Sequence, residues 1–251
     1  MTRRSDRRRQ SLAADLWRAE EEWRNATRCS ELLRVKADIS ERKWRLFAIE
    51  CCRAILPMCV EPWHREAFEQ AEQLADNPDP GSGCRGISQL REPDNLRRRW
   101  SDWYESEWYF PHRPAAEVWA ERAILDLAVW REGAATRHPI HRSLLAALAP
   151  ESNPDHDRLR EEWDGRFAST LREIAGNPFE LVNFDTNWRT FNAISLARMM
   201  YHNREFSPMP ILADALQDAG CDNEDILNHC RDANATHVRG CWVVDLVLGR
   251  Q

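Results

Sequence analysis

Apolar residues recur at intervals of three and four along most of this 251-residue chain, and this spacing decides which folds it can adopt. Between residues 41 and 56, for example, Trp44, Phe47, Ala48 and Cys51 fall on one face of a helix. Strict alternation of apolar and polar residues, which marks half-buried strands, is almost absent. We therefore predict an all-α fold, an irregular multi-helix bundle of about nine to twelve helices.

Composition divides the chain into four segments. Residues 1–10 hold five arginines and no apolar residue after Met1, which predicts a disordered basic arm. Residues 77–86, NPDPGSGCRG, are rich in proline and glycine, and we interpret them as a loop. The other two segments, residues 11–76 and 87–249, are then expected to form an N-terminal and a C-terminal helical subdomain.

Two of the predicted helices are apolar over more than one face, and we expect both to lie in the interior. They run from Glu41 to Leu56 and from Val238 to Leu248, the second with Thr236 as its cap. Only Asp245 interrupts the second apolar run. A buried carboxylate is costly unless it is paired, so an arginine from another part of the chain should contact Asp245.

The charge distribution argues against a nucleic-acid-binding surface. The chain carries a net charge of −6, yet its first ten residues contain five arginines and one aspartate, so the other 241 residues carry −10. The negative charge of these 241 residues would repel phosphate groups, even though the N-terminal arm is basic. We expect no nucleic-acid partner, and we keep binding through the basic arm as a weaker alternative.

The cysteines indicate a reducing compartment. The eight cysteines include the adjacent pair Cys51 and Cys52 and form no C-x-x-C motif, unlike the dense framework of small secreted domains. We predict reduced thiols and a cytoplasmic location. No stretch approaches the roughly 20 apolar residues that a membrane helix needs, so no membrane partner is expected.

Several short motifs resemble one family of proteins. The chain reads RLFAIECC from Arg45 to Cys52, and near its end ADALQDAGC, HCR and HVRGCWVVDLVLG. In these motifs it resembles a heavily duplicated family of uncharacterised planctomycete proteins, and the resemblance covers about half the chain. The resemblance implies no particular activity.

The end of the chain also gathers side chains that could bind a metal. They are Cys221, His229, Cys230, His237 and Cys241. Such ligands suit zinc, which four of them can surround tetrahedrally. Their spacing matches no familiar zinc motif, and burial on helix faces already accounts for the cysteines. We interpret them as metal-free structural residues, with zinc as the alternative. A zinc site would require at least four side chains, drawn from these five and from Cys51 and Cys52, to place their ligand atoms within about 4 Å of one another.

No catalytic motif is present. The chain has no G-x-S-x-G, no phosphate-binding glycine loop and no H-E-x-x-H. We therefore predict no catalytic residue and no cofactor. The favoured hypothesis is a non-enzymatic helical module that binds a protein partner or serves as a scaffold, and the alternative is a zinc-stabilised or zinc-dependent protein.

Overall fold

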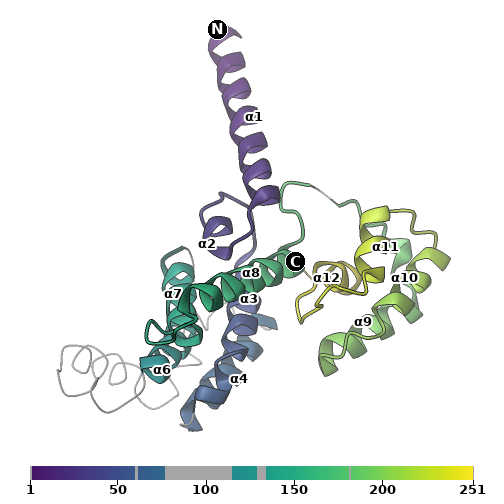
Figure 1. Ribbon diagram of the computed structural model, residues 1–251. Coiled ribbons are helices and arrows are strands. Elements are labelled where there is room, and N and C mark those ends of the chain that lie inside the picture. Colours follow the sequence, from purple (N-terminus) through teal and green to yellow (C-terminus); the bar gives the residue numbers. More distant parts are fainter. Residues whose placement is uncertain (1, 60–61, 77–114, 129–133, 181, 251) are drawn as a thin grey trace. The chain divides into compact units, whose positions relative to one another are not determined.

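The structure, a computed structural model, describes the chain except for residues 1, 60–61, 77–114, 129–133, 181 and 251 (Figure 1). Within these limits it contains eleven α-helices and two short 3-10 helices, and no strand, which confirms the predicted all-α fold. The helices and their bounds are α1 Thr2–Asn25, α2 Cys29–Leu32, α3 Glu41–Arg53, η1 Leu56–Met58, α4 Pro62–Asp76, α6 Ala115–Ala128, α7 Ala134–Leu148, α8 His156–Ala175, η4 Thr186–Trp188, α9 Phe191–Asn203, α10 Met209–Asp218, α11 Glu224–Arg231 and α12 Trp242–Leu248.

The chain forms two compact units, and the boundaries between them differ from those of the predicted subdomains. Unit 1 consists of Met1–Lys43 and Ala168–Gln251, and unit 2 consists of Trp44–Phe167. Both divisions fall inside helices, α3 and α8, where no change of composition marks them. The loop predicted at residues 77–86 lies outside the described residues.

Helix α1 begins at Thr2, inside the segment for which the composition predicts a disordered basic arm. Arginine is a strong helix former, and residues 2–25 contain neither glycine nor proline.

Unit 2 is built around α6, which packs against α4, α7 and η1. Ile124 and Leu127 of α6 are almost completely buried. Among polar groups, His64 of α4 and Glu121 of α6 are also buried, with Nε2 and Oε1 3.7 Å apart. The predicted interior position of α3 is confirmed, since Trp44 and Cys51 are each 3% exposed.

The core of unit 1 is formed by α9, α10, α11 and α12 (Figure 1). Each of these helices packs against the next in sequence, and α12 also packs against α9. Its largest buried side chains include Met200, Met209, Leu212 and Leu216. Helix α10 ends as its sequence predicts, because Gly220 takes a positive φ of 91° directly after the helix.

Helix α12 is shorter than predicted, and it is buried as predicted. It starts at Trp242 and not after Thr236, because Gly240 adopts a φ of 96°, which right-handed helix does not allow. Val243, Val244 and Val247 are at most 1% exposed. In the part of the chain that is described, no helix combines the length and the apolar character needed to cross a membrane.

Candidate metal centre

Four potential metal ligands converge in unit 1, between α8, α11 and the segment that precedes α12. They are Glu173, His229, His237 and Cys241, and each contributes one ligand atom such that all four atoms lie within 4.8 Å of one another. Three of these residues belong to the five named from the sequence. Cys221 and Cys230 are not part of the group, and neither are Cys51 and Cys52, which belong to unit 2.

Helix α11 directs the side chains of its two adjacent candidate ligands, His229 and Cys230, to different sides. Asn223 caps the helix by accepting a hydrogen bond from the Ile226 amide at 3.1 Å. Neighbouring helical residues point about 100° apart. Cys230 therefore continues the buried face of Ile226, at 1% exposure, whereas His229 points toward the ligand group.

The segment between α11 and α12 turns back so that His237 and Cys241 approach α11. Its first bend is held by Asp232, whose carboxylate accepts from the Asn234 amide at 2.9 Å. Gly240 provides the positive φ that starts α12, and Cys241 then serves as the N-cap residue of that helix. A segment of nonhelical backbone thus places two of the four ligands.

Glu173 lies in the last turn of α8, and its carboxylate connects the two histidines. Oε1 is 3.0 Å from Nδ1 of His237, and Oε2 is 3.5 Å from Nε2 of His229. The side chains of Glu173 and His237 are each 7% exposed. Sequence reasoning missed Glu173. Its one signal was weak: a carboxylate in the last helical turn faces the negative end of the helix dipole.

The four side chains also form a hydrogen-bond network with Trp242. Trp242 donates its indole N–H to Nδ1 of His229 at 3.2 Å. Because Nδ1 accepts, the proton of neutral His229 must sit on Nε2, which is 3.2 Å from Sγ of Cys241. His237 can donate from Nδ1 to Glu173. In this state the thiol keeps its proton.

The pKa shifts follow from this network. Burial by itself raises the pKa of Glu173, but hydrogen bonds from His229 and His237 and their proximity outweigh it, so the net shift is downward. Burial first, and the nearby Glu173 carboxylate second, raise the pKa of Cys241 well above the ordinary thiol value. A bound cation would reverse the second shift, since a coordinating thiol is deprotonated.

The spacing of the ligand atoms is close to that of a tetrahedral zinc site. With Zn–N bonds near 2.0–2.1 Å and Zn–S near 2.3 Å, neighbouring ligand atoms lie about 3.3–3.8 Å apart. Nε2 of His229 lies 3.2 Å from Sγ of Cys241, and the two oxygens of Glu173 lie 3.0 Å from His237 and 3.5 Å from His229. Ligand atoms as far apart as 4.8 Å would have to approach each other by about 1 Å to bind one ion. The geometric condition set from the sequence is not met as stated, because Glu173 takes the fourth position in place of a cysteine.

Comparison with known proteins adds no further constraint on this site. The chain matches no protein-family model, no curated protein and no solved structure.

Proposed function

We propose that unit 1 is a metal-stabilised, non-enzymatic helical module that binds one zinc ion through Glu173, His229, His237 and Cys241. The observation that carries the proposal is the convergence of four ligand atoms within 4.8 Å. They come from α8, from α11 and from the segment before α12, so one ion would fix three parts of the chain to each other.

The donor set favours zinc over the other common ions. Two imidazole nitrogens, one thiolate and one carboxylate oxygen are ligands that zinc accepts together at tetrahedral angles. Calcium and magnesium bind oxygen ligands and coordinate six or more of them. Copper would compete on affinity, so the identity of the metal is decided by measuring the purified protein.

Four protein ligands indicate a structural ion and not a catalytic one. Catalytic zinc sites have three protein ligands and leave the fourth position to water or substrate. Here protein groups would take all four positions, and they are shielded from water: Cys241 is completely buried, and the His229 side chain is only 16% exposed. This arrangement agrees with the absence of catalytic motifs in the sequence.

Zinc binding and the hydrogen-bond network are alternative states of one cluster. Coordination through Nε2 of His229 moves the proton of that ring to Nδ1, where it would face the Trp242 N–H at a donor–donor distance of 3.2 Å. The indole must then turn away. Coordination also removes the Cys241 proton, so binding should release protons and weaken at acidic pH.

The role of such a module is to present helices to a partner protein, as the sequence analysis favours. A zinc site that ties α11 and α12 to the end of α8 would stiffen the surface formed by α9 and α10, which pack on α11 and α12. A cytoplasmic location would keep Cys241 reduced and available to the metal.

Elemental analysis of the purified full-length chain tests the proposal. We expect one zinc per chain, a loss of the ion in Cys241→Ser and His237→Ala, and a lower melting temperature after chelation. The matched controls change the same residue types outside the cluster: Cys221→Ser and His202→Ala should retain full zinc content.

Two outcomes would overturn the proposal. One is a chain that contains no metal after growth in zinc-supplemented medium and binds none in calorimetry. The other is zinc that is retained in Cys241→Ser and His237→Ala but lost in Cys221→Ser, which would place the ion elsewhere.

A further inference from the structure

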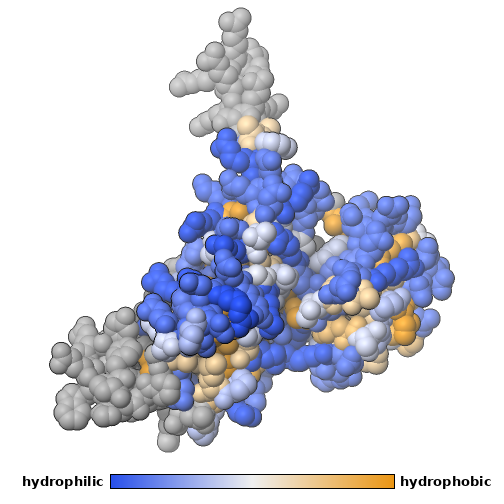
Figure 2. Space-filling view, viewed as in Figure 1, coloured by the Kyte–Doolittle hydropathy of each residue, from blue (hydrophilic) through white to orange (hydrophobic). Residues whose placement is uncertain are grey.

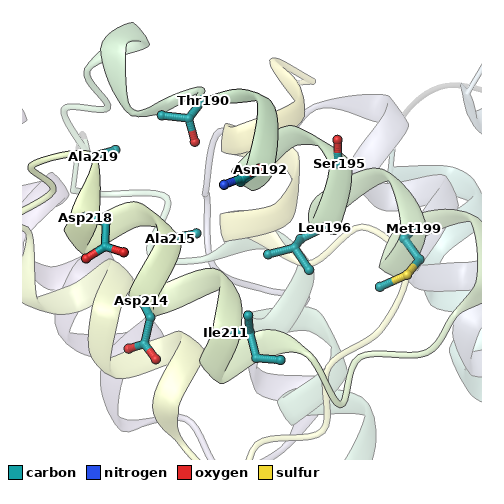
Figure 3. A pocket seen from close by; sticks show the side chains of 10 residues that line it. All are labelled: Thr190, Asn192, Ser195, Leu196, Met199, Ile211, Asp214, Ala215, Asp218 and Ala219. Carbon is teal, nitrogen blue, oxygen red and sulfur yellow. The ribbon is translucent and has the colours of Figure 1, made fainter.

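A groove lies on unit 1 between α9 and α10. Its volume is about 620 Å³, and both helices line it with residues spaced i, i+3, i+4 and i+7 (Figure 3). On α9 these residues are Asn192, Ser195, Leu196 and Met199. A stripe of eight residues is about 10.5 Å long, so the groove is long enough for two turns of another helix.

The floor and the rim of the groove differ in character. Leu196 and Ile211 point into the space between the two helices, together with Met199 and Ala215 (Figure 3). Met199 is 45% exposed and Ile211 is 59% exposed, and apolar surface gathers over this part of the molecule (Figure 2). Exposed apolar surface of this kind marks an interaction site.

Two carboxylates give the rim a negative charge. Asp214 and Asp218 lie on successive turns of α10 at the edge of the groove. The Asp214 carboxylate is paired with Arg231 at 3.0 Å, but its side chain is 71% exposed and stays accessible to a second cation. An apolar groove with an acidic rim fits an amphipathic helix that carries positive charge.

Helix α1 has these properties. Leu16 and Trp17 are 53% and 66% exposed, and with Ala13 they form an apolar i, i+3, i+4 set. Five arginines lie within residues 3–9, and Arg18 follows Trp17 directly. The segment is therefore both apolar and basic, as the groove requires.

The same chain does not fill its own groove, because the other end of α1 is fixed elsewhere in unit 1. Trp23 is 3% exposed and packs edge-on against Phe179 at 6.4 Å. Arg172 donates to the carbonyl oxygens of Trp23 and Ala26. With α1 anchored in this way, Leu16 and Trp17 stay exposed on their own chain.

We propose that the groove between α9 and α10 binds the exposed part of α1 from a second copy of this chain. Trp17 and Leu16 would fill the apolar floor, and the arginines of the same helix would face Asp214 and Asp218. The contact joins two different surfaces, so two copies can exchange their α1 helices reciprocally or continue the contact into longer assemblies.

Sedimentation of the full-length chain over a series of concentrations tests the proposal. We expect association of the unmodified chain, and association about thirtyfold weaker in Trp17→Ser and in Ile211→Asp, since a central aromatic and its pocket dominate such contacts. Both positions are exposed, so the variants should fold. Asp218→Lys should also weaken association, whereas Glu151→Lys, the same charge change at an exposed position in unit 2, should not.

Mixing the two variants gives the sharpest result. Trp17→Ser retains an intact groove and Ile211→Asp retains an intact α1, so an equimolar mixture should form a heterodimer that neither variant forms alone. A monomeric unmodified chain at every concentration, an Ile211→Asp variant that associates normally, or a mixture that stays monomeric would each overturn the proposal.

Discussion

Arg42, at the start of α3, donates two hydrogen bonds to Asp245, in the middle of α12, at 2.6 and 3.1 Å. The side chain of Asp245 is 1% exposed and that of Arg42 is 13% exposed. Burial raises the pKa of Asp245, and the bonds and charge of Arg42 counteract that shift. The arginine partner that the sequence predicted for Asp245 is thereby confirmed and identified.

Removing Arg42 should destabilise the fold strongly. Arg42→Ala leaves a buried carboxylate without its cation, which costs about 3–5 kcal/mol of the free energy of unfolding. Urea denaturation measures this change.

An exposed pair in the same unit provides the control for Arg42. Arg24 lies 3.1 Å from Glu180, with side chains 63% and 52% exposed. Arg24→Ala should cost only about 0–1 kcal/mol, as surface ion pairs do. Equal effects of the two substitutions would contradict the importance assigned to burial.

Gly176 should tolerate alanine less well than Gly249 does. Both glycines have a φ near +67°, which costs an alanine about 1–2 kcal/mol. At Gly176 the new Cβ would also lie 3.1 Å from Cγ of Trp242, whereas at Gly249 the nearest atom is 3.5 Å away. We expect Gly176→Ala to be about 1 kcal/mol more destabilising, measured by urea denaturation, because the indole must shift. If Gly249→Ala costs as much or more, the contact with Trp242 is unimportant.

If the four residues bind zinc as proposed, Trp242→Phe should tighten that binding. The substitution removes the N–H donor that holds the His229 proton on Nε2 in the metal-free state. A hydrogen bond of about 0.5–1.5 kcal/mol corresponds to a dissociation constant lowered about two- to tenfold, which competition with a chelator of known affinity would measure.

The control for Trp242→Phe is Trp188→Phe. Trp188 is also in unit 1 and packs edge-on against Phe184, but it has no contact with the four ligands among its described interactions. This variant should leave zinc affinity unchanged. Weaker binding in Trp242→Phe would contradict the prediction and would mean that the indole orients His229 for metal binding.

Alkaline pH should destabilise unit 2 through Cys52. Burial, with smaller contributions from Cys59 and Asp126, raises the pKa of Cys52 above the ordinary value of 9.0. Above pH 9 the unfolded chain loses this proton while the folded chain keeps it. The folded state then binds more protons, so stability falls as pH rises, by up to about 1.4 kcal/mol per pH unit.

Cys52→Ala should reduce this pH dependence relative to the unmodified chain, in urea midpoints measured between pH 8 and about 10.5. Ile49→Val, at another buried position of α3, should lower stability equally at every pH. An unchanged slope in Cys52→Ala would show that this thiol ionises in the folded state as it does in the unfolded chain.

The helices could be predicted because their apolar faces follow from local spacing. Helix α10 matches its predicted end at Gly220, and α3 is buried along Trp44 and Cys51, as its apolar residues indicate. The start of α12 could not be predicted from spacing, because it depends on the backbone conformation of Gly240. The sequence from Thr236 onward is compatible with a helix, and the conformation of the surrounding chain overrides it.

The candidate site was predictable only in part, for a related reason. His229, His237 and Cys241 are close in sequence and have side chains that suggest a metal. Glu173 is 64 residues from His237, and a glutamate on a helix has the composition of an ordinary solvent-facing residue. Only the three-dimensional arrangement brings it to the cluster.

The division of the chain has a consequence for how the protein matures during synthesis. Unit 2 ends at Phe167, so all of it is synthesised before residues 168–251. Until then residues 1–43 lack the rest of unit 1, and Trp23 lacks Phe179, against which its ring packs. Arg42 likewise lacks Asp245, the carboxylate with which it forms an ion pair in the folded protein. Unit 2 can therefore begin to fold earlier, whereas unit 1 can be completed only after residues 168–251 have been made.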